Sequence, residues 1–152
     1  MSKYVGVAVA DPVFDSVTAL NGIVSAGPVL MRSTPAAVST VGNATYTAAQ
    51  FVAPAIIRTG PTGAYSDTTP TAAQIIQALP GAVVGSGYYM TIVNTVAFAA
   101  TIVAGTGVTL SGTTAIAASS ARDYMVYVTA LANPATGAGP TVTMQGVSAG
   151  TL

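Results

Sequence analysis

Ionisable side chains are scarce in this sequence, and their scarcity constrains the fold and the function more than any other feature. Of 152 residues, four are Lys or Arg and four are Asp, while Glu and His do not occur. Charged residues make up 5% of the chain, against about 25% in a typical globular protein, and the formal net charge is zero. A surface with so few charges has little repulsion to keep free monomers apart. The sequence therefore predicts a protein whose surface is covered by neighbouring subunits.

The same scarcity excludes several classes of function. Binding to nucleic acid needs a cluster of Lys and Arg, and four cations spread along the chain form none, so we expect no nucleic-acid partner. Without His and Cys, a Ser-His-Asp site, a Cys-His site or a typical zinc site cannot be built. Asp11 and Asp15 are the only close pair of carboxylates, and a turn or cap role suits them better than calcium binding. We predict no enzyme activity, no catalytic residue, no metal and no cofactor.

A membrane location has to be considered, because 51% of the residues are hydrophobic and the mean hydropathy is +0.65. The charge-free stretch between Asp67 and Arg122 is, however, broken by Pro80 and several glycines. No run approaches the roughly 20 apolar residues that a spanning helix needs. Near the N-terminus, Asp11 and Pro12 interrupt a short apolar run too early for a signal peptide. We expect no membrane partner and synthesis in a cytoplasm.

Prolines dominate the organisation of the first part of the chain. Five of the nine lie within residues 1–66, where they exclude long helices and favour extended segments joined by turns. Short β-rich pieces occur in this part of the chain, at 4–10, 23–31 and 46–57. Two interpretations are open, an irregular first half of one β domain or an arm that reaches across a neighbouring subunit. We therefore divide the chain into an extended, Pro-spaced N-terminal arm or irregular β segment, 1–66, and a compact β domain, 67–152.

One short helix is indicated at about residues 70–79. The run from Asp67 to Pro70 offers N-cap groups and a proline suited to the first helical position, and Pro80 and Gly81 end the helix. A helix of this length is too short to stand alone in water, so its apolar face should close one end of a β structure. That face consists of Ala72, Ile75, Ile76 and Leu79.

From Ser86 onward the apolar pattern has a period of two, which is typical of β strands separated by Gly-rich turns. The predicted strands are 87–94, 98–104, 108–110, 113–117, 122–129 and 141–147. Neither face of the clearest strand, 122–129, is strongly polar. We predict an all-β fold, an antiparallel β-barrel or sandwich with one short helix and an extended N-terminal arm. One sheet face should pack inside while the other meets a partner.

Tyrosine is the main aromatic residue, with seven Tyr, three Phe and no Trp. Its ring can pack while its hydroxyl reaches water or a partner. Carbohydrate stacking on these rings is an alternative, although no cluster of Asp, Asn and Trp accompanies them. Arg122 and Asp123 are adjacent in a strand and face opposite sides, which leaves a solvated edge or a cross-subunit ion pair open. The predicted interface residues are Tyr4, Val5, Phe14, Phe51, Ile56, Ile57, Tyr88, Tyr127 and Arg122.

The order of segments in residues 67–146 is distinctive. DTTPTAAQIIQAL is followed by YYMTIVNT, ATIVAGTGVTLSGTT, a strand after Arg122 and TVTMQG. This Ala/Thr/Gly-rich order resembles virion structural proteins of tailed bacteriophages, and among them small capsid decoration (cement) proteins. The resemblance lies in style and in the order of elements, so it transfers no residue with a fixed chemical role.

Decoration proteins bind the outside of an icosahedral shell, often as trimers or dimers at symmetry axes, and stabilise capsomer junctions. The resemblance therefore implies a structural virion protein on the outer capsid surface, synthesised in the cytoplasm of a bacterial host. Its implied partners are the major capsid protein and copies of itself, in a homotrimer. A tail or head fibre component is an alternative, although the chain shows no stalk-like repeat. From another class, a carbohydrate-binding module is the alternative.

Overall fold

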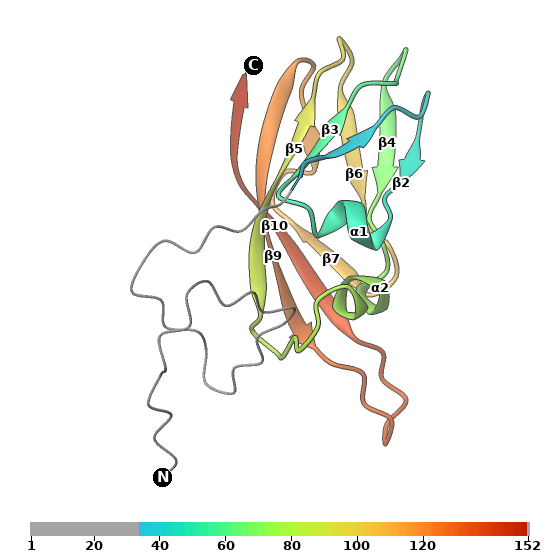
Figure 1. Cartoon of the computed structure of the whole chain (residues 1–152), viewed down its shortest axis with the longest axis vertical. Helices are drawn as coiled ribbons and strands as arrows, with labels where there is room; N and C mark the ends of the chain where they lie inside the picture. Colours follow the sequence, from blue (N-terminus) through green and yellow to red (C-terminus); the bar gives the residue numbers. More distant parts are fainter. Residues whose placement is uncertain (1–33, 152) are drawn as a thin grey trace, which may run out of the picture. The chain divides into compact units, whose positions relative to one another are not determined.

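Two β sheets make up the part of the chain that the structure, a computed structural model, describes, which is residues 34–151 (Figure 1). The larger sheet has six strands in the order β1-β3-β5-β9-β10-β7, and the smaller has four in the order β2-β4-β6-β8. The strands are β1 (Ala36–Val38), β2 (Ala44–Thr45), β3 (Ala55–Arg58), β4 (Tyr65–Thr68), β5 (Gly87–Asn94), β6 (Ala100–Val103), β7 (Val108–Ser111), β8 (Ala115–Ile116), β9 (Ser120–Ala130) and β10 (Thr141–Thr151). The helices are α1 (Ala48–Phe51) and α2 (Ala72–Gln77).

Both sheets are mixed, so the prediction of an all-β antiparallel barrel or sandwich is wrong. In the larger sheet β1–β3, β3–β5 and β10–β7 are parallel pairs, whereas β5–β9 and β9–β10 are antiparallel. In the smaller sheet β2–β4 and β4–β6 are parallel and β6–β8 is antiparallel. With 9% helix, the fold is a mixed α/β fold built on two mixed sheets.

The path of the chain explains why many neighbouring strands are parallel. Strands β1 to β8 alternate strictly between the two sheets, so neighbours within a sheet are usually two strands apart along the sequence. A chain that reverses at each crossing returns to the first sheet in its original direction, which makes such neighbours parallel, as in β1–β3, β3–β5, β2–β4 and β4–β6. The pair β6–β8 departs from this pattern and is antiparallel. A period of two identifies a strand but carries no information about the direction of its neighbour.

The core lies between the sheets and is closed at one end by the helices. Alternate residues of the strands point inward, and the buried side chains of both helices belong to the same cluster. In Figure 1 both helices lie beyond the lower ends of β2 and β4. The largest fully buried apolar side chains are Tyr124, Phe51, Ile56, Ile75, Met90, Ile92, Ile116, Met144, Val126, Val128 and Val142.

Both helices begin with the same capping box. Helix α2 is shorter than the predicted 70–79, and its N-cap is Thr71, whose Oγ1 accepts from the Gln74 amide (3.3 Å) while Gln74 Oε1 accepts from the Thr71 amide (2.9 Å). Asp67, predicted in the capping run, is instead a buried residue of β4. Helix α1, which was not predicted, uses Thr47 and Gln50 in the same way.

Residues 34–66 supply β1, β2, α1, β3 and the start of β4. These strands pair with β5 and β6 from the later part of the chain. Residues 34–151 belong to one unit by Cα proximity, and the predicted boundary at residue 66 falls within β4. Residues 1–33 of the predicted arm lie outside the described residues.

Candidate protein-interaction face

The six-stranded sheet has one face turned toward the core and one turned away, and we call the second the outer face. On β5, for example, Met90 and Ile92 are buried while Tyr89, Thr91 and Val93 alternate with them. The buried side chains of α1 and α2 belong to the core cluster, on the other side of this sheet. The outer face consists of Ala37, Ala55, Ile57, Gly87, Tyr89, Thr91, Val93, Ala121, Asp123, Met125, Tyr127, Thr143, Gln145 and Ser148.

Strand register arranges the apolar members of the outer face in rows. Ala37, Ile57, Val93 and Ala121 lie next to one another across β1, β3, β5 and β9. Beyond the row of Thr91 and Asp123, another row places Met125 between Tyr89 and Gln145. The next row places Tyr127 between Gly87 and Thr143. Tyr89 is 67% exposed. Aromatic and Met side chains of this kind are enriched at the centres of protein interfaces.

Asp123 is the one ionisable residue of the outer face. Its Oδ1 accepts a hydrogen bond from Thr91 Oγ1 (2.7 Å) on β5, and its Oδ2 accepts one from Ser148 Oγ (2.9 Å) on β10. Each carboxylate oxygen thus has a hydroxyl donor from a neighbouring strand. These hydroxyls lower the cost of covering the carboxylate, but they do not neutralise its charge, so a partner that buries it has to offset that charge.

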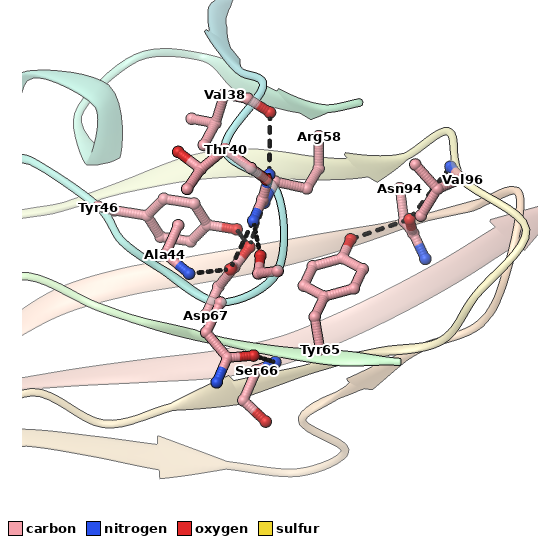
Figure 2. Close-up of polar contacts among 12 residues, drawn as sticks. Val38, Thr40, Ala44, Tyr46, Arg58, Tyr65, Ser66, Asp67, Asn94 and Val96 are labelled. Atoms are coloured by element: carbon pink, nitrogen blue, oxygen red, sulfur yellow. Dashed lines mark hydrogen bonds and ion pairs between the residues drawn. The ribbon is translucent and has the colours of Figure 1, made fainter. Parts of the chain in front are cut away.

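Arg58 and Asp67 form an ion pair in the interior, and Figure 2 shows the polar contacts around it. Arg58 Nε lies 2.7 Å from Asp67 Oδ2, and both side chains are 0% exposed. The pair joins β3 of the larger sheet to β4 of the smaller one. Every N–H of the guanidinium has an acceptor: the two Asp67 oxygens and the carbonyls of Val38, Thr40 and Gly42.

The carboxylate of Asp67 is equally well satisfied. Besides Arg58, it accepts from the Ala44 amide (2.9 Å) and the Tyr46 hydroxyl (2.7 Å). Burial, with the hydrogen bond to Asp67, raises the pKa of Tyr46 far above its ordinary value. The Arg58 guanidinium carbon lies 4.9 Å from the ring centroid of Tyr65, whose pKa burial raises to about 12. This closed network holds the segment after β1 against β3 and β4.

The network leaves very little charge on the surface. Residues 34–151 contain four ionisable side chains, of which Arg58 and Asp67 neutralise each other in the interior. Only Arg122 and Asp123 remain to charge the surface of this part of the chain. Arg122 points to the core side, where its Nε donates to the Ala115 carbonyl (3.0 Å) of β8.

The predicted interface residues are distributed over different environments. Ile57 and Tyr127 lie on the outer face. Phe51 and Ile56 are 0% exposed, which corrects the prediction that they are interface residues. Phe51 points inward from α1, and Ile56 lies on the inner side of β3. Tyr88 is half-buried on the inner side, and its hydroxyl donates to the Phe51 carbonyl (3.2 Å). Tyr4, Val5 and Phe14 lie outside the described residues.

The interface residues predicted from the sequence do not include Tyr89, Val93 and Met125, which lie on the outer face. The period-two pattern does place each of them on the side of its strand opposite to the buried neighbours. Both faces of these strands are apolar, however, so the pattern alone could not say which face is outside.

Metal-ligating side chains are scarce in residues 34–151, which contain Asp67 and Asp123 but no Glu, His or Cys. This range contains no group of three or more His, Cys, Asp or Glu side chains that could hold a metal ion. Neither of its two helices has the length and apolar character to cross a bilayer. No family model, curated protein or solved structure matches the chain.

Proposed function

We propose that this chain is a structural protein of a tailed-bacteriophage particle, a capsid decoration (cement) protein that acts without catalysis. The observation that carries the proposal is the charge distribution. In residues 34–151 the buried Arg58–Asp67 pair leaves only Arg122 and Asp123 to charge the surface. Such a surface opposes association only weakly.

The outer face supplies the contact surface that this function needs. Tyr89, Met125 and Tyr127 lie in two neighbouring rows of this face. The row of Thr91 and Asp123 separates them from the apolar row that contains Ile57 and Val93. Anchoring by aromatic side chains in a desolvated centre is how many interfaces obtain most of their binding energy. The proposed partner on this face is the major capsid protein, and the proposed location is the outer capsid surface. Copies of the chain itself are the second partner, in a trimer or a dimer as the resemblance implies.

Attachment to undecorated capsids tests the proposal. The purified full chain should co-sediment with the shells, and Tyr89→Lys should weaken attachment by at least about tenfold, since about 1.4 kcal/mol is enough for that and loss of an aromatic anchor at an interface commonly costs about 2 kcal/mol or more. The matched control is Val41→Lys, a change at a valine that is 71% exposed in the segment after β1 and outside the outer face. Val41→Lys should attach like the unmodified chain.

Two results would count against the proposal in different ways. If the unmodified chain binds no undecorated shell, the proposed decoration function is wrong. If Tyr89→Lys attaches as well as the unmodified chain, the outer face is not the contact surface. Binding on a glycan array that is lost in Tyr127→Ala would instead support the carbohydrate-binding alternative.

A further inference from the structure

Asp123 is a single carboxylate between two rows of the outer face that carry no charge. On one side lies the apolar row that contains Val93, and on the other lies the row that contains Tyr89 and Met125. Asp123 is half-buried in the free chain, so water reaches only part of its side chain. A partner that covers both neighbouring rows therefore covers this carboxylate as well.

No cation within residues 34–151 offsets the charge of Asp123. This range contains two arginines and no lysine. Arg58 is paired in the interior, and Arg122 extends from the opposite side of β9, where its Nε donates to a backbone carbonyl of β8. The two hydroxyls that donate to Asp123 are neutral. Hydrogen bonds thus hold this carboxylate in place, and its charge has no counter-charge in the described part of the chain.

The hydrogen bonds of Asp123 leave each carboxylate oxygen able to accept one more donor. A carboxylate has about four acceptor sites, two on each oxygen. Thr91 Oγ1 occupies one site of Oδ1 at 2.7 Å, and Ser148 Oγ occupies one site of Oδ2 at 2.9 Å. These donors come from β5 and β10, on the two sides of β9, and they fix the orientation of the carboxylate. A group with two parallel N–H donors can meet both oxygens at once, and the guanidinium of Arg is the side chain that presents such a fork.

Tyr89 gives this carboxylate an aromatic neighbour. It lies on β5 two residues before Thr91, which is directly opposite Asp123, and it is 67% exposed. Diagonal neighbours of this kind are within reach of an aromatic side chain. A guanidinium that pairs with Asp123 can also stack on the Tyr89 ring, whereas a lysine ammonium lacks a planar surface for stacking. Arg is enriched at protein interfaces and Lys is depleted.

We propose that Asp123 determines the specificity of the outer face by receiving an arginine side chain of the major capsid protein. This inference rests on the proposed function and names the chemistry of its partner. A buried ion pair adds little affinity beyond an apolar contact of the same size, but it excludes partners that have no cation at this place. A covered pair is also screened little by salt, so it is compatible with attachment that depends weakly on ionic strength.

The direction of the effect of one substitution tests the inference. Asp123→Asn keeps the size of the side chain and can still form hydrogen bonds with both hydroxyls, but it removes the charge. With an arginine over Asp123, this change leaves the guanidinium without a counter-charge, and attachment to undecorated capsids should weaken about thirtyfold or more. With no cation there, removal of the charge makes the face less costly to cover. Attachment that is unchanged or tighter therefore overturns the inference.

Two further variants control for charge and for folding. Asp123→Glu keeps the charge and should attach more tightly than Asp123→Asn. Arg122→Gln removes the other surface charge of residues 34–151, on the opposite side of β9, and should attach within about twofold of the unmodified chain. Circular dichroism spectra and urea midpoints, measured without shells, check that each variant is folded. A loss in Arg122→Gln as large as that in Asp123→Asn would also overturn the inference.

The outcomes separate this inference from the proposed function. If the unmodified chain does not attach to shells, the proposed function itself is contradicted. If Tyr89→Lys weakens attachment while Asp123→Asn does not, the outer face is the contact surface and only the arginine is wrong.

Chemical modification of the shells identifies the cation without any variant of the chain. Phenylglyoxal modifies accessible arginine side chains, and acetic anhydride modifies lysine amines. Mass spectrometry should show that at least one arginine of the major capsid protein loses most of its reactivity when shells are decorated with the unmodified chain. Protection of a lysine and of no arginine, or of neither, would overturn the inference even if Asp123→Asn fails to fold.

Discussion

At the scale of single residues, the buried pair of Arg58 and Asp67 decides how the charge of this chain is distributed. A buried ion pair repays the cost of dehydration only when the remaining donors and acceptors are satisfied. Here five guanidinium hydrogen bonds and two further donors to the carboxylate meet that requirement. The pair could not be predicted from the sequence, because Asp67 precedes a convincing helix signal and nothing in the spacing links it to Arg58.

Removing one partner should be far more costly than removing both. Arg58→Met or Asp67→Leu alone leaves an uncompensated buried charge, and each should lower the free energy of unfolding by about 3–5 kcal/mol. The double variant Arg58→Met/Asp67→Leu should recover a large part of that loss. Urea unfolding of the four proteins measures the coupling. Arg122→Met, which removes a partly exposed guanidinium, is the control and should cost about 1 kcal/mol or less. Additive losses in the double variant would show that the two side chains do not act as a pair.

Buried tyrosines should make the fold sensitive to alkali. Burial raises the pKa of Tyr46, Tyr65, Tyr88 and Tyr124 above the ordinary value, to about 12 for Tyr65 and Tyr124. The unfolded chain loses these protons near pH 10 while the folded chain retains them, so stability is complete below about pH 10 and falls as the pH rises toward about 12. Urea midpoints measured across this range should decrease together with the appearance of phenolate absorbance.

Tyr124 provides the control for this pH dependence. Its hydroxyl is the one buried side-chain polar atom in the described residues without a hydrogen-bond partner. Tyr124→Phe should therefore cost little stability at neutral pH. Above about pH 10 its urea midpoint should fall less steeply with pH than that of the unmodified chain, because one buried tyrosine fewer contributes to the fall. Midpoints that stay constant up to pH 12 would mean that these rings are accessible to solvent in the native protein.

At the scale of elements, local signals located most of the segments and missed their pairing. The predicted strands 87–94, 122–129 and 141–147 overlap β5, β9 and β10 closely. The sequence Thr-Ala-Ala-Gln occurs at 47–50 and again at 71–74, and it starts both helices. Only the second copy was interpreted as part of a helix, because the first lies in a β-rich, Pro-spaced segment. Whether a neighbour is parallel depends on the path between the sheets, which period-two patterns do not encode.

The connection between β3 and β4 contains a matched pair of glycines. A Cβ at Gly60 would overlap the backbone carbonyls of Ser39 and Thr40, whereas a Cβ at Gly63 would meet nothing within 4 Å. Gly60→Ala should lower the free energy of unfolding by about 3 kcal/mol or more, because backbone must move and the Thr40 carbonyl is an acceptor of Arg58. Gly63→Ala should change it by about 0.5 kcal/mol in either direction. Thermal unfolding of the two variants checks this, and equal midpoints would exclude the close approach.

At the scale of the whole molecule, apolar and backbone contacts have to supply the binding energy. With formal net charge zero and two charged side chains on the surface of residues 34–151, long-range attraction contributes little. The scarcity of charge and the layered arrangement of inward and outward strand residues could be read from the sequence. The face that points outward could not, because its residues are as apolar as those of the core.

Association should consequently be almost independent of salt. Raising NaCl from about 0.1 M to about 1 M shortens the Debye length from about 10 Å to about 3 Å, yet shell attachment should change by less than about twofold. Co-sedimentation with shells at the two salt concentrations measures it. A loss of tenfold or more would indicate that charged groups, and not the outer face, dominate binding.

The position of β10 in the sheet order also governs when the molecule can be completed during synthesis. The strand that comes latest in the described chain lies between β9 and β7 in the larger sheet, so β7 has no partner in that sheet until β10 has left the ribosome. Pairing over such separations is slow compared with local hairpin formation. The larger sheet is therefore closed by the strand that is synthesised last among the described residues, and a nascent chain that ends before β10 leaves β7 without a partner in that sheet.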